Sequence, residues 1–307
     1  MGKPAVHIND HTKAGKRDII NVLIDIKSLI KGKVLIANVL PVLTGFLLVL
    51  YFTNATLKAN LDLFIFTMIG STLTIAGALI INNWYEVDLD REMTRTKQRP
   101  TVTGNFSMNA VLTMGISASV IGLLIMLLTT MEAFIYAFLG WFIYVVLYTF
   151  WSKRRYTLNT VIGSVSGAFT PMIGWAAIDS AFHIIPIVLF ILLFIWQVPH
   201  TFAIAMRRYH EYKAAGVPML PVVYGFEVTK RQTFIYIVCL FPLPFLMSIM
   251  GTTFVVLTTI LNIVWIVLGF SGFYMKDDIK WANLNFYYSL AYLNFIFLML
   301  ILISWMG

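Results

Sequence analysis

Four carboxylates and four cationic side chains follow an apolar stretch within residues 82–100, which read NNWYEVDLDREMTRTKQRP. Asn82, Glu86 and Asp90 recur at intervals of four, so they share one face if residues 63–90 form a single helix. Amide and carboxylate oxygens suit Mg²⁺, which commonly completes its coordination with water and substrate phosphate. The spacing therefore predicts a site for Mg²⁺ and a lipid diphosphate at the end of this helix.

The composition places these side chains in a membrane protein. Of the 307 residues, 59% are hydrophobic and 12% are charged, and the mean hydropathy is +0.83. These values are typical of an integral membrane protein. Apolar runs long enough to cross about 30 Å of hydrocarbon lie at residues 34–52, 63–81, 110–130, 133–151, 158–177, 184–204, 234–250, 254–275 and 286–306. We therefore predict an all-α polytopic membrane protein with nine transmembrane helices, in which one membrane domain (34–307) follows a basic tail (1–33).

The distribution of Lys and Arg predicts the orientation in the membrane. Of the 22 Lys and Arg residues, 21 fall in the tail or in the even-numbered loops between the predicted helices, and only Lys58 falls in an odd-numbered loop. Cytoplasmic loops collect Lys and Arg during insertion, so we expect a cytoplasmic N-terminus and, after nine crossings, an external C-terminus. In a bacterium the location would be the plasma membrane. The net charge of +8 is explained by this bias and by anionic lipid, and gives no reason to expect nucleic acid as a partner.

The carboxylates are harder to explain by insertion than the cations are. Orientation requires no Asp or Glu, and burying a carboxylate at the membrane boundary is costly unless it is paired or bound to a metal. Asp88 is an exception, because it lies six residues from Asn82 and therefore on a different part of the helix surface. We expect Asp88 to face elsewhere as a solvated charge.

Two further loops on the same side carry polar side chains. In the loop between the fourth and fifth predicted helices, Lys153 and Arg154 come just after Tyr148. Between the sixth and seventh helices, the candidate side chains are Gln197, His200, Arg207, Arg208, Glu211 and Lys213. For each single cation, orientation in the membrane together with contact to lipid headgroups is as good an explanation as a role in the site.

His200 follows Pro199, at which we expect a break in the sixth helix. The imidazole could be a ligand, an acid or base, or a hydrogen-bonded residue at a helix interface. A zinc site is disfavoured because no second histidine has suitable spacing. Polar, non-helical backbone at membrane depth is tolerated where it lines a cavity, so contact of His200 with a substrate is the favoured interpretation.

Three sequence blocks together resemble the UbiA-type intramembrane prenyltransferases, and within them most closely the branch that farnesylates haem. They are NNWYEVDLDREMTRTKQRP, KRRYTLNTVIGSVSGAFTPMIGW and WQVPHTFAIAMRRYHEYKAAGVPMLPVV. The resemblance implies a nine-helix bundle with a central cavity open to lipid and capped by cytoplasmic loops. It also implies that Asn82, Glu86 and Asp90 hold Mg²⁺. The implied diphosphate-binding residues are Lys31, Asn83, Arg95, Arg99, Lys153 and Arg154.

The same resemblance implies transfer of a farnesyl group from farnesyl diphosphate to a vinyl group of haem B, with addition of water. Glu86, Asp90, Lys153 and His200 are then the candidate catalytic residues, and the third loop would lie near haem. Tyr148, Trp84 or Tyr85 could shield the allylic cation. A downstream haem-modifying enzyme is a possible partner.

The chain departs from the family pattern at two positions, because Glu86 and Glu211 stand where the family usually has Asp. Both changes retain the charge and lengthen the side chain by one methylene. Two alternatives stay open. A quinone-type prenyltransferase should carry more acids in the third loop, and a transporter for an anionic lipid or porphyrin should place ionisable residues near the membrane midplane.

Overall fold

The computed structural model describes residues 19–306, which fold into helices and contain no strand. Positions 1–18 of the predicted basic tail therefore lie outside the described residues. The helices are α1 (Ile19–Leu29), α2 (Gly32–Thr53), α3 (Leu61–Tyr85), α4 (Val87–Glu92), α5 (Pro100–Thr103), α6 (Met108–Met126), α7 (Met131–Phe142), η1 (Ile143–Ser152), α8 (Asn159–Ala168), α9 (Thr170–Ala176), α10 (Ile184–Arg207), α11 (Tyr209–Ala214), α12 (Leu220–Cys239), α13 (Leu243–Leu246), η2 (Ser248–Met250), α14 (Thr252–Ser271) and α15 (Asp278–Met306).

The prediction of an all-helical membrane protein is confirmed, whereas the count of nine spans is not. Seven helical segments among the described residues are long and apolar enough to cross a bilayer: α2, α3, α6, α7 with η1, α10, α14 and α15. Many large apolar side chains on these helices are exposed, including Ile36, Ile121 and Val267. A bilayer would cover such side chains.

The fifth and seventh predicted spans are interrupted. Residues 158–177 form α8 and α9, which meet at Phe169. The other span, residues 234–250, is divided among the end of α12 at Cys239, α13 and η2, with Pro242 and Pro244 after α12. Before this span, α12 also contains a non-helical residue, Gly225, with φ of 78°. A glycine at positive φ and closely spaced prolines are both incompatible with a regular helix. Hydropathy alone does not reveal such interruptions.

Small residues bring neighbouring helices into close contact. A Cβ atom on Gly77 of α3 would lie 2.3 Å from Oγ of Ser119 on α6, and one on Gly174 of α9 would lie 1.9 Å from the carbonyl oxygen of Val42 on α2. Without glycine the backbones could not approach so closely. Packing of this kind drives helix association in lipid, where the hydrophobic effect between helices is weak.

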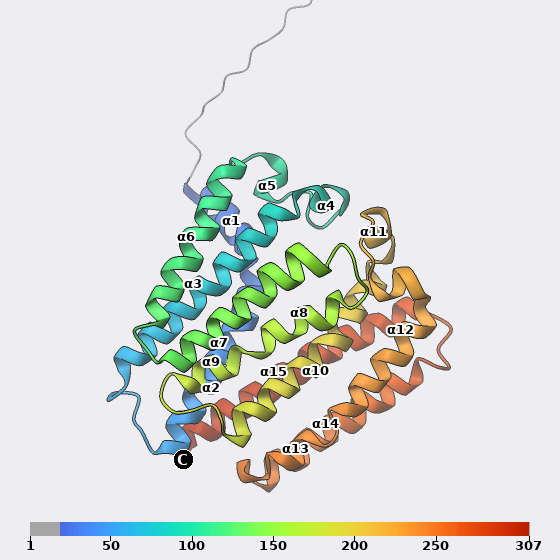
Figure 1. Cartoon of the computed structure of the whole chain (residues 1–307). Coiled ribbons are helices and arrows are strands. Elements are labelled where there is room, and N and C mark those ends of the chain that lie inside the picture. The colour runs from blue at the N-terminus through green and yellow to red at the C-terminus, as the bar shows by residue number, and fades with distance from the viewer. Residues whose placement is uncertain (1–18, 307) are drawn as a thin grey trace, which may run out of the picture.

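Three short helices, α4, α5 and α11, gather at one end of the bundle (Figure 1). Figure 1 shows α4, α5 and α11 at that end and the C-terminus at the opposite end. α1 also lies near the short helices, where its fully buried Leu29 packs with Ile80 and Val111. Part of the predicted basic tail is therefore a helix docked on the bundle, and it brings Lys31 to the polar end.

Candidate active site

The polar end of α3 places Asn82 and Glu86 in direct contact. Nδ2 of Asn82 donates hydrogen bonds to Oε1 of Glu86 at 2.8 Å and to Oγ1 of Thr149 at 3.0 Å. The prediction of one helix through residue 90 is wrong, because α3 ends at Tyr85 and Glu86 has φ of −99° and ψ of 16°. The amide of Asp90 nevertheless still donates to the carbonyl of Glu86 at 2.9 Å, so α4 begins directly after Glu86.

Lys31 reaches this site from the junction of α1 and α2. Its backbone is left-handed, with φ of 48° and ψ of 55°, a conformation that is uncommon for residues other than glycine and that often marks functional positions. The ammonium of Lys31 donates to Oδ1 of Asn82. The tight junction thus directs a cation from the N-terminal region onto the amide at the end of α3.

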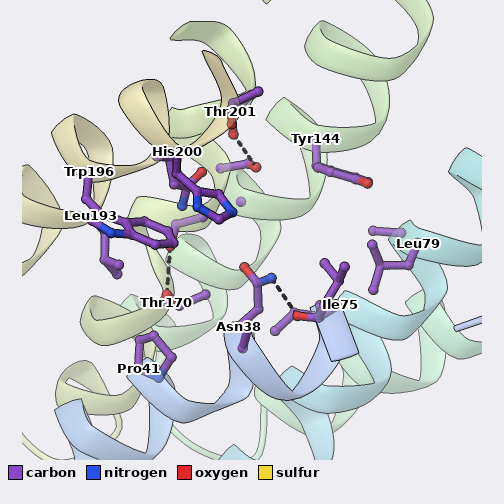
Figure 2. Close-up of a pocket in the computed structure, with 18 of the residues that line it drawn as sticks. Asn38, Pro41, Ile75, Leu79, Tyr144, Thr170, Leu193, Trp196, His200 and Thr201 are labelled. Atoms are coloured by element: carbon purple, nitrogen blue, oxygen red, sulfur yellow. Dashed lines mark hydrogen bonds between the residues drawn. The ribbon is translucent and has the colours of Figure 1, made fainter. Parts of the chain in front are cut away.

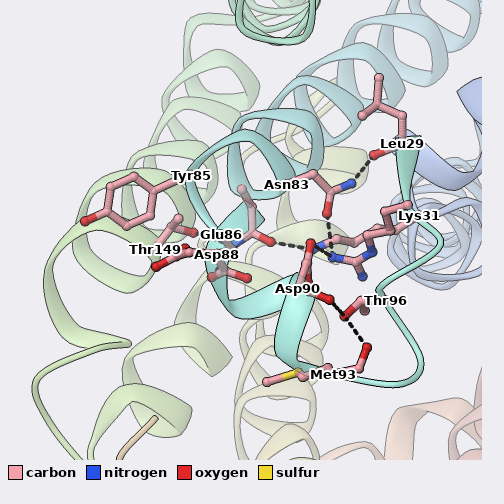
Figure 3. Close-up of polar contacts among 12 residues, drawn as sticks. Leu29, Lys31, Asn83, Tyr85, Glu86, Asp88, Asp90, Met93, Thr96 and Thr149 are labelled. Carbon is pink, nitrogen blue, oxygen red and sulfur yellow. Dashed lines mark hydrogen bonds and ion pairs between the residues drawn. The ribbon is translucent and has the colours of Figure 1, made fainter. Parts of the chain in front are cut away.

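Two buried ion pairs surround this contact. Figure 3 shows their carboxylates, on Glu86 and Asp90, near Lys31 and Asn83. Nζ of Lys153 lies 2.6 Å from the carboxylate of Glu86. Nη1 of Arg99 donates to Oδ2 of Asp90 at 2.6 Å and to Oδ1 of Asn83 at 2.8 Å. Asn83 in turn donates to the carbonyl of Leu29 at 2.5 Å. The four segments that contribute these residues are therefore tied together by charged and amide side chains.

Burial alone would raise the pKa of Glu86, but Lys153 and Lys31 more than offset it and hold the pKa below its ordinary value. For Lys153, burial opposes the charged form, whereas Glu86 stabilises it and raises the pKa above its ordinary value. Glu86 and Lys153 therefore form a pair of opposite full charges in a buried place. Such a pair can exchange partners when a ligand brings charges of its own.

The cluster has a surplus of positive charge. Three cations (Lys31, Arg99 and Lys153) face two buried carboxylates (Glu86 and Asp90). Burial, followed by repulsion from Arg99, lowers the pKa of Lys31 to about 7, although Glu86 pulls in the opposite direction. A multiply charged anion would relieve this repulsion. The electrostatics thus favour an anionic ligand such as a diphosphate.

Arg154 and Arg95, which we predicted to bind the diphosphate, lie outside this cluster. Arg154 forms a bidentate pair with Asp88, with both N–O distances at 2.7 Å, and its guanidinium stacks 4.8 Å from the ring centre of Tyr85. The Asp88 side chain is 58% exposed, which confirms that it faces away from Asn82. Arg95 is exposed on the segment between α4 and α5. Neither arginine contacts the buried carboxylates.

An apolar cavity of about 470 Å³ lies beside the polar cluster. It is lined by residues of α2, α3, α7, η1, α8, α9, α10 and α15. On α3 the lining residues Ala78 and Leu79 precede Asn82 and Asn83 by one turn. On η1 the lining residue Tyr144 precedes Lys153 by about two turns. The cavity therefore begins about one helical turn from the polar cluster on α3 and extends away from it along the helices.

His200 lines this cavity together with Trp196 and Gln197 (Figure 2). The expected break after Pro199 is wrong, because α10 runs without interruption through that residue. Proline removes one backbone hydrogen bond, but the buried residues Val198 and Phe202 on either side hold the helix in place by packing. Gln197 fits against Gly167 of α8, where a Cβ atom would lie 2.0 Å from Nε2 of the glutamine.

The other predicted residues of the third loop do not line the cavity. Arg208 and Glu211 pair with each other at 2.7 Å, and Lys213 is exposed with its ammonium 5.6 Å from the ring centre of Tyr209. Arg207 lies against the ring of Phe286 at 4.1 Å. These side chains surround the polar end of the bundle rather than the cavity itself.

The structure also changes which aromatic residues are candidates. Trp84 packs with the group around Leu29, and Tyr85 lies under Arg154, so neither lines the cavity. Tyr144, which sequence reasoning missed, does line it, and its ring centre is 5.5 Å from that of Tyr148. The spacing of four residues between the two tyrosines was a usable signal, because Tyr148 was already a candidate.

The predicted Mg²⁺ ligands fit the ion in their donor chemistry. Asn82, Glu86 and Asp90 are buried and supply amide and carboxylate oxygens, the ligand types that Mg²⁺ prefers. No group of three or more His, Cys, Asp or Glu side chains with metal-site geometry occurs in residues 19–306, so the protein alone offers few ligands. Mg²⁺ usually retains waters and binds through one or two carboxylates plus substrate phosphates, which agrees with this sparse set.

Comparison with known proteins identifies the family. The profile of the UbiA prenyltransferase family matches residues 38–300. The chain is 51% identical over 298 residues to a protein named protoheme IX farnesyltransferase from Oceanobacillus iheyensis, covering 97% of this chain and 95% of that one. It is 52% identical over 281 residues to a protein of the same name from Bacillus cereus strain B4264, covering 91% and 92% of the two chains.

Solved structures of similar fold agree with this match. A structure of digeranylgeranylglyceryl phosphate synthase has a TM-score of 0.73 at 19% identity and covers 92% of this chain and 99% of that one. A UbiA homolog from Archaeoglobus fulgidus, solved with DMAPP and Mg²⁺, has a TM-score of 0.64 at 17% identity over 88% of this chain and 99% of its own. These structures share the fold, and the profile match together with the relatives at 51% and 52% identity shows that the chain belongs to the UbiA prenyltransferase family.

Proposed function

We propose that the protein transfers the farnesyl group of farnesyl diphosphate to a vinyl group of haem B, with addition of water, and releases haem O and diphosphate. The observation that carries this proposal is the junction of a positively charged cluster with an apolar cavity of about 470 Å³. A prenyl diphosphate likewise consists of a charged diphosphate group, which suits the cluster, and an apolar chain, which suits the cavity. The choice of haem as acceptor is supported by the names of the relatives that are 51% and 52% identical.

In this proposal Lys31, Arg99 and Lys153 bind the diphosphate. In the structure their charges are partly satisfied by Asn82, Asp90 and Glu86. Asn82, Glu86 and Asp90 would hold Mg²⁺, which when bound neutralises charge on the leaving diphosphate. The cations freed from the carboxylates can then donate hydrogen bonds to phosphate oxygens. Their preorganised charge stabilises the diphosphate as negative charge develops during cleavage of the allylic carbon–oxygen bond.

The cavity would receive the prenyl chain and the acceptor. Its walls include Ile75, Leu79, Leu193 and Leu290, which suit an isoprenoid and exclude water from a reactive allylic cation. The ring of Tyr144 lies at the polar end, where its π-face can stabilise positive charge. We further propose that this polar end faces the cytoplasm, with the protein in the plasma membrane of a bacterium.

The test is product analysis of the purified protein in liposomes. The protein is incubated with haem B, farnesyl diphosphate and Mg²⁺, and a parallel sample contains a chelator in place of the metal. We expect mass spectrometry to detect hydroxyethylfarnesyl haem only in the sample with metal. Unchanged haem in a protein that still binds farnesyl diphosphate would point to another prenyl acceptor, such as a quinone precursor.

A further inference from the structure

The imidazole of His200 is held on both faces by aromatic rings. Its ring centre lies 4.7 Å from that of Trp196, with an angle of 16° between the planes, and 5.2 Å from that of Phe286, with an angle of 24°. The guanidinium of Arg207 lies 4.1 Å from the centre of Phe286. This stack fixes the plane of the imidazole, which projects from α10 into the space between Trp196 and Tyr144 (Figure 2).

Ser289 of α15 determines which nitrogen carries the proton. Oγ of Ser289 lies 2.7 Å from Nδ1 of His200 and also 2.7 Å from the carbonyl oxygen of Phe286. A carbonyl can only accept, so the hydroxyl proton of Ser289 points to Phe286. The oxygen of Ser289 is then the acceptor for His200, which requires a proton on Nδ1. Neutral His200 therefore carries its lone pair on Nε2.

The same serine residue also fixes Trp196. Nε1 of Trp196 donates to the backbone carbonyl of Ser289 at 2.8 Å, and Ser289 is fully buried. Nε2 of His200 has no hydrogen-bond partner among residues 19–306, and the side chain lines the cavity. The whole arrangement thus presents one unshared electron pair to a mostly apolar space.

An imidazole nitrogen with its other N–H hydrogen-bonded is the usual form of a histidine that ligates a metal. We infer that Nε2 of His200 is an axial ligand of the iron of haem in this cavity, and that Ser289 is a positioning residue that fixes its tautomer. The inference rests on the proposed use of haem as acceptor. Axial ligation would hold the macrocycle at one height in the cavity, so that a vinyl group at its edge meets the prenyl chain.

The test is spectroscopy of haem bound to the purified protein in lipid nanodiscs, measured without farnesyl diphosphate. We expect the wild-type protein to shift the Soret band and the electron paramagnetic resonance signal of ferric haem to those of a histidine-ligated iron. His200→Ala should lose this signature, and added imidazole should restore it. Ser289→Ala should weaken haem binding on the order of tenfold, the usual effect of removing the hydrogen-bond partner of a ligating histidine.

Ser304→Ala is the matched control. Ser304 lies on the same helix and donates to the carbonyl three residues earlier at 2.7 Å, as Ser289 does, but it contacts no histidine. Haem affinity should be unchanged in this variant, and retained binding of farnesyl diphosphate shows that each variant is folded.

A wild-type spectrum identical to that of folded His200→Ala overturns the ligation, and an unchanged haem affinity in Ser289→Ala overturns the positioning role. If the wild-type protein makes product without a histidine-ligated spectrum, this inference fails while the proposed function stands. A ligated spectrum with no product contradicts the proposed function alone.

Discussion

Glu86 and Asp88 are two carboxylates of the same short segment in opposite environments. Glu86 is buried between Asn82 and Lys153, whereas Asp88 is largely exposed and pairs with Arg154. A surface ion pair contributes little to stability, because solvent screens it. A buried carboxylate that can bind a metal has a much larger effect on the chemistry. Substitution of each carboxylate in turn therefore compares a residue of the candidate site with a surface residue only two positions away.

We predict that Glu86→Gln lowers turnover roughly 100-fold or more, an effect comparable to removing one preorganised group that stabilises charge in a transition state. Glutamine retains the shape but leaves Lys153 without its counter-charge and removes one anionic ligand for Mg²⁺. Asp88→Asn should stay within about threefold of wild type, since it disrupts only an exposed pair. The measurement is the initial rate of prenylated haem formation at saturating Mg²⁺. Equal losses in the two variants would contradict the assignment of the site.

The contacts within this site differ in how far the sequence predicts them. Asn82 and Glu86 are four residues apart on a helix, so their contact follows from the helical period. The bond from Lys31 to Asn82 spans 51 residues, and that between His200 and Ser289 spans 89. Resemblance to the family suggested Lys31, but no pattern in the sequence pointed to Ser289. Contacts between distant helices depend on packing, which periodicity does not specify.

At the scale of the helices, glycine positions decide which elements can approach one another. Gly174 of α9 lies against the backbone of α2, and Gly45 of α2 lies against α9, where its Cβ atom would be 2.1 Å from the carbonyl oxygen of Pro171. Both helices contribute to the wall of the cavity, through Pro41 and Ile173. The spacing of these two helices therefore affects both stability and the shape of the cavity.

We predict that Gly174→Ala destabilises the protein by about 1–3 kcal/mol, the usual cost of overpacking a well-packed contact. The added methyl group meets the carbonyl of Val42, which belongs to the backbone and cannot rotate away. Gly140→Ala is a suitable control, because its Cβ atom would lie 3.3 Å from the carbonyl of Ser166 and needs only a small shift. Thermal unfolding in detergent, followed by circular dichroism, measures the difference. A melting temperature of Gly174→Ala equal to that of Gly140→Ala would contradict the prediction.

The helices themselves were predictable where they are long and apolar, and less so where the backbone is interrupted. Residues 34–52 lie within α2, and residues 63–81 lie within α3. By contrast, hydropathy does not register the positive φ of Gly225. Pro199 produced the opposite error, since a break was expected and packing keeps α10 intact. The π-helical turns of η1, which carry Tyr144 and Tyr148, leave no recognised mark on the sequence.

For the whole molecule, the charge distribution and the structure agree on one polar end. Lys31, Arg99 and Lys153 meet there, and α4, α5 and α11 surround it (Figure 1). Lys58 lies on the connection between α2 and α3, and the C-terminal end of α15 also lies away from the polar end. Cytoplasmic loops collect positive charge, so the polar end is the one that we place in the cytoplasm.

This orientation predicts opposite labelling of two exposed positions. Cys239 is the only cysteine and is exposed, so Cys239→Ser provides a background without thiols. In that background, Lys58→Cys should react with a membrane-impermeant maleimide in intact cells, whereas Lys97→Cys should react only after the membrane is permeabilised. Both lysines are exposed on short connections, so a difference in labelling reports the side of the membrane rather than burial. Labelling of Lys97→Cys in intact cells would reverse the orientation and place the diphosphate site on the outer side of the membrane.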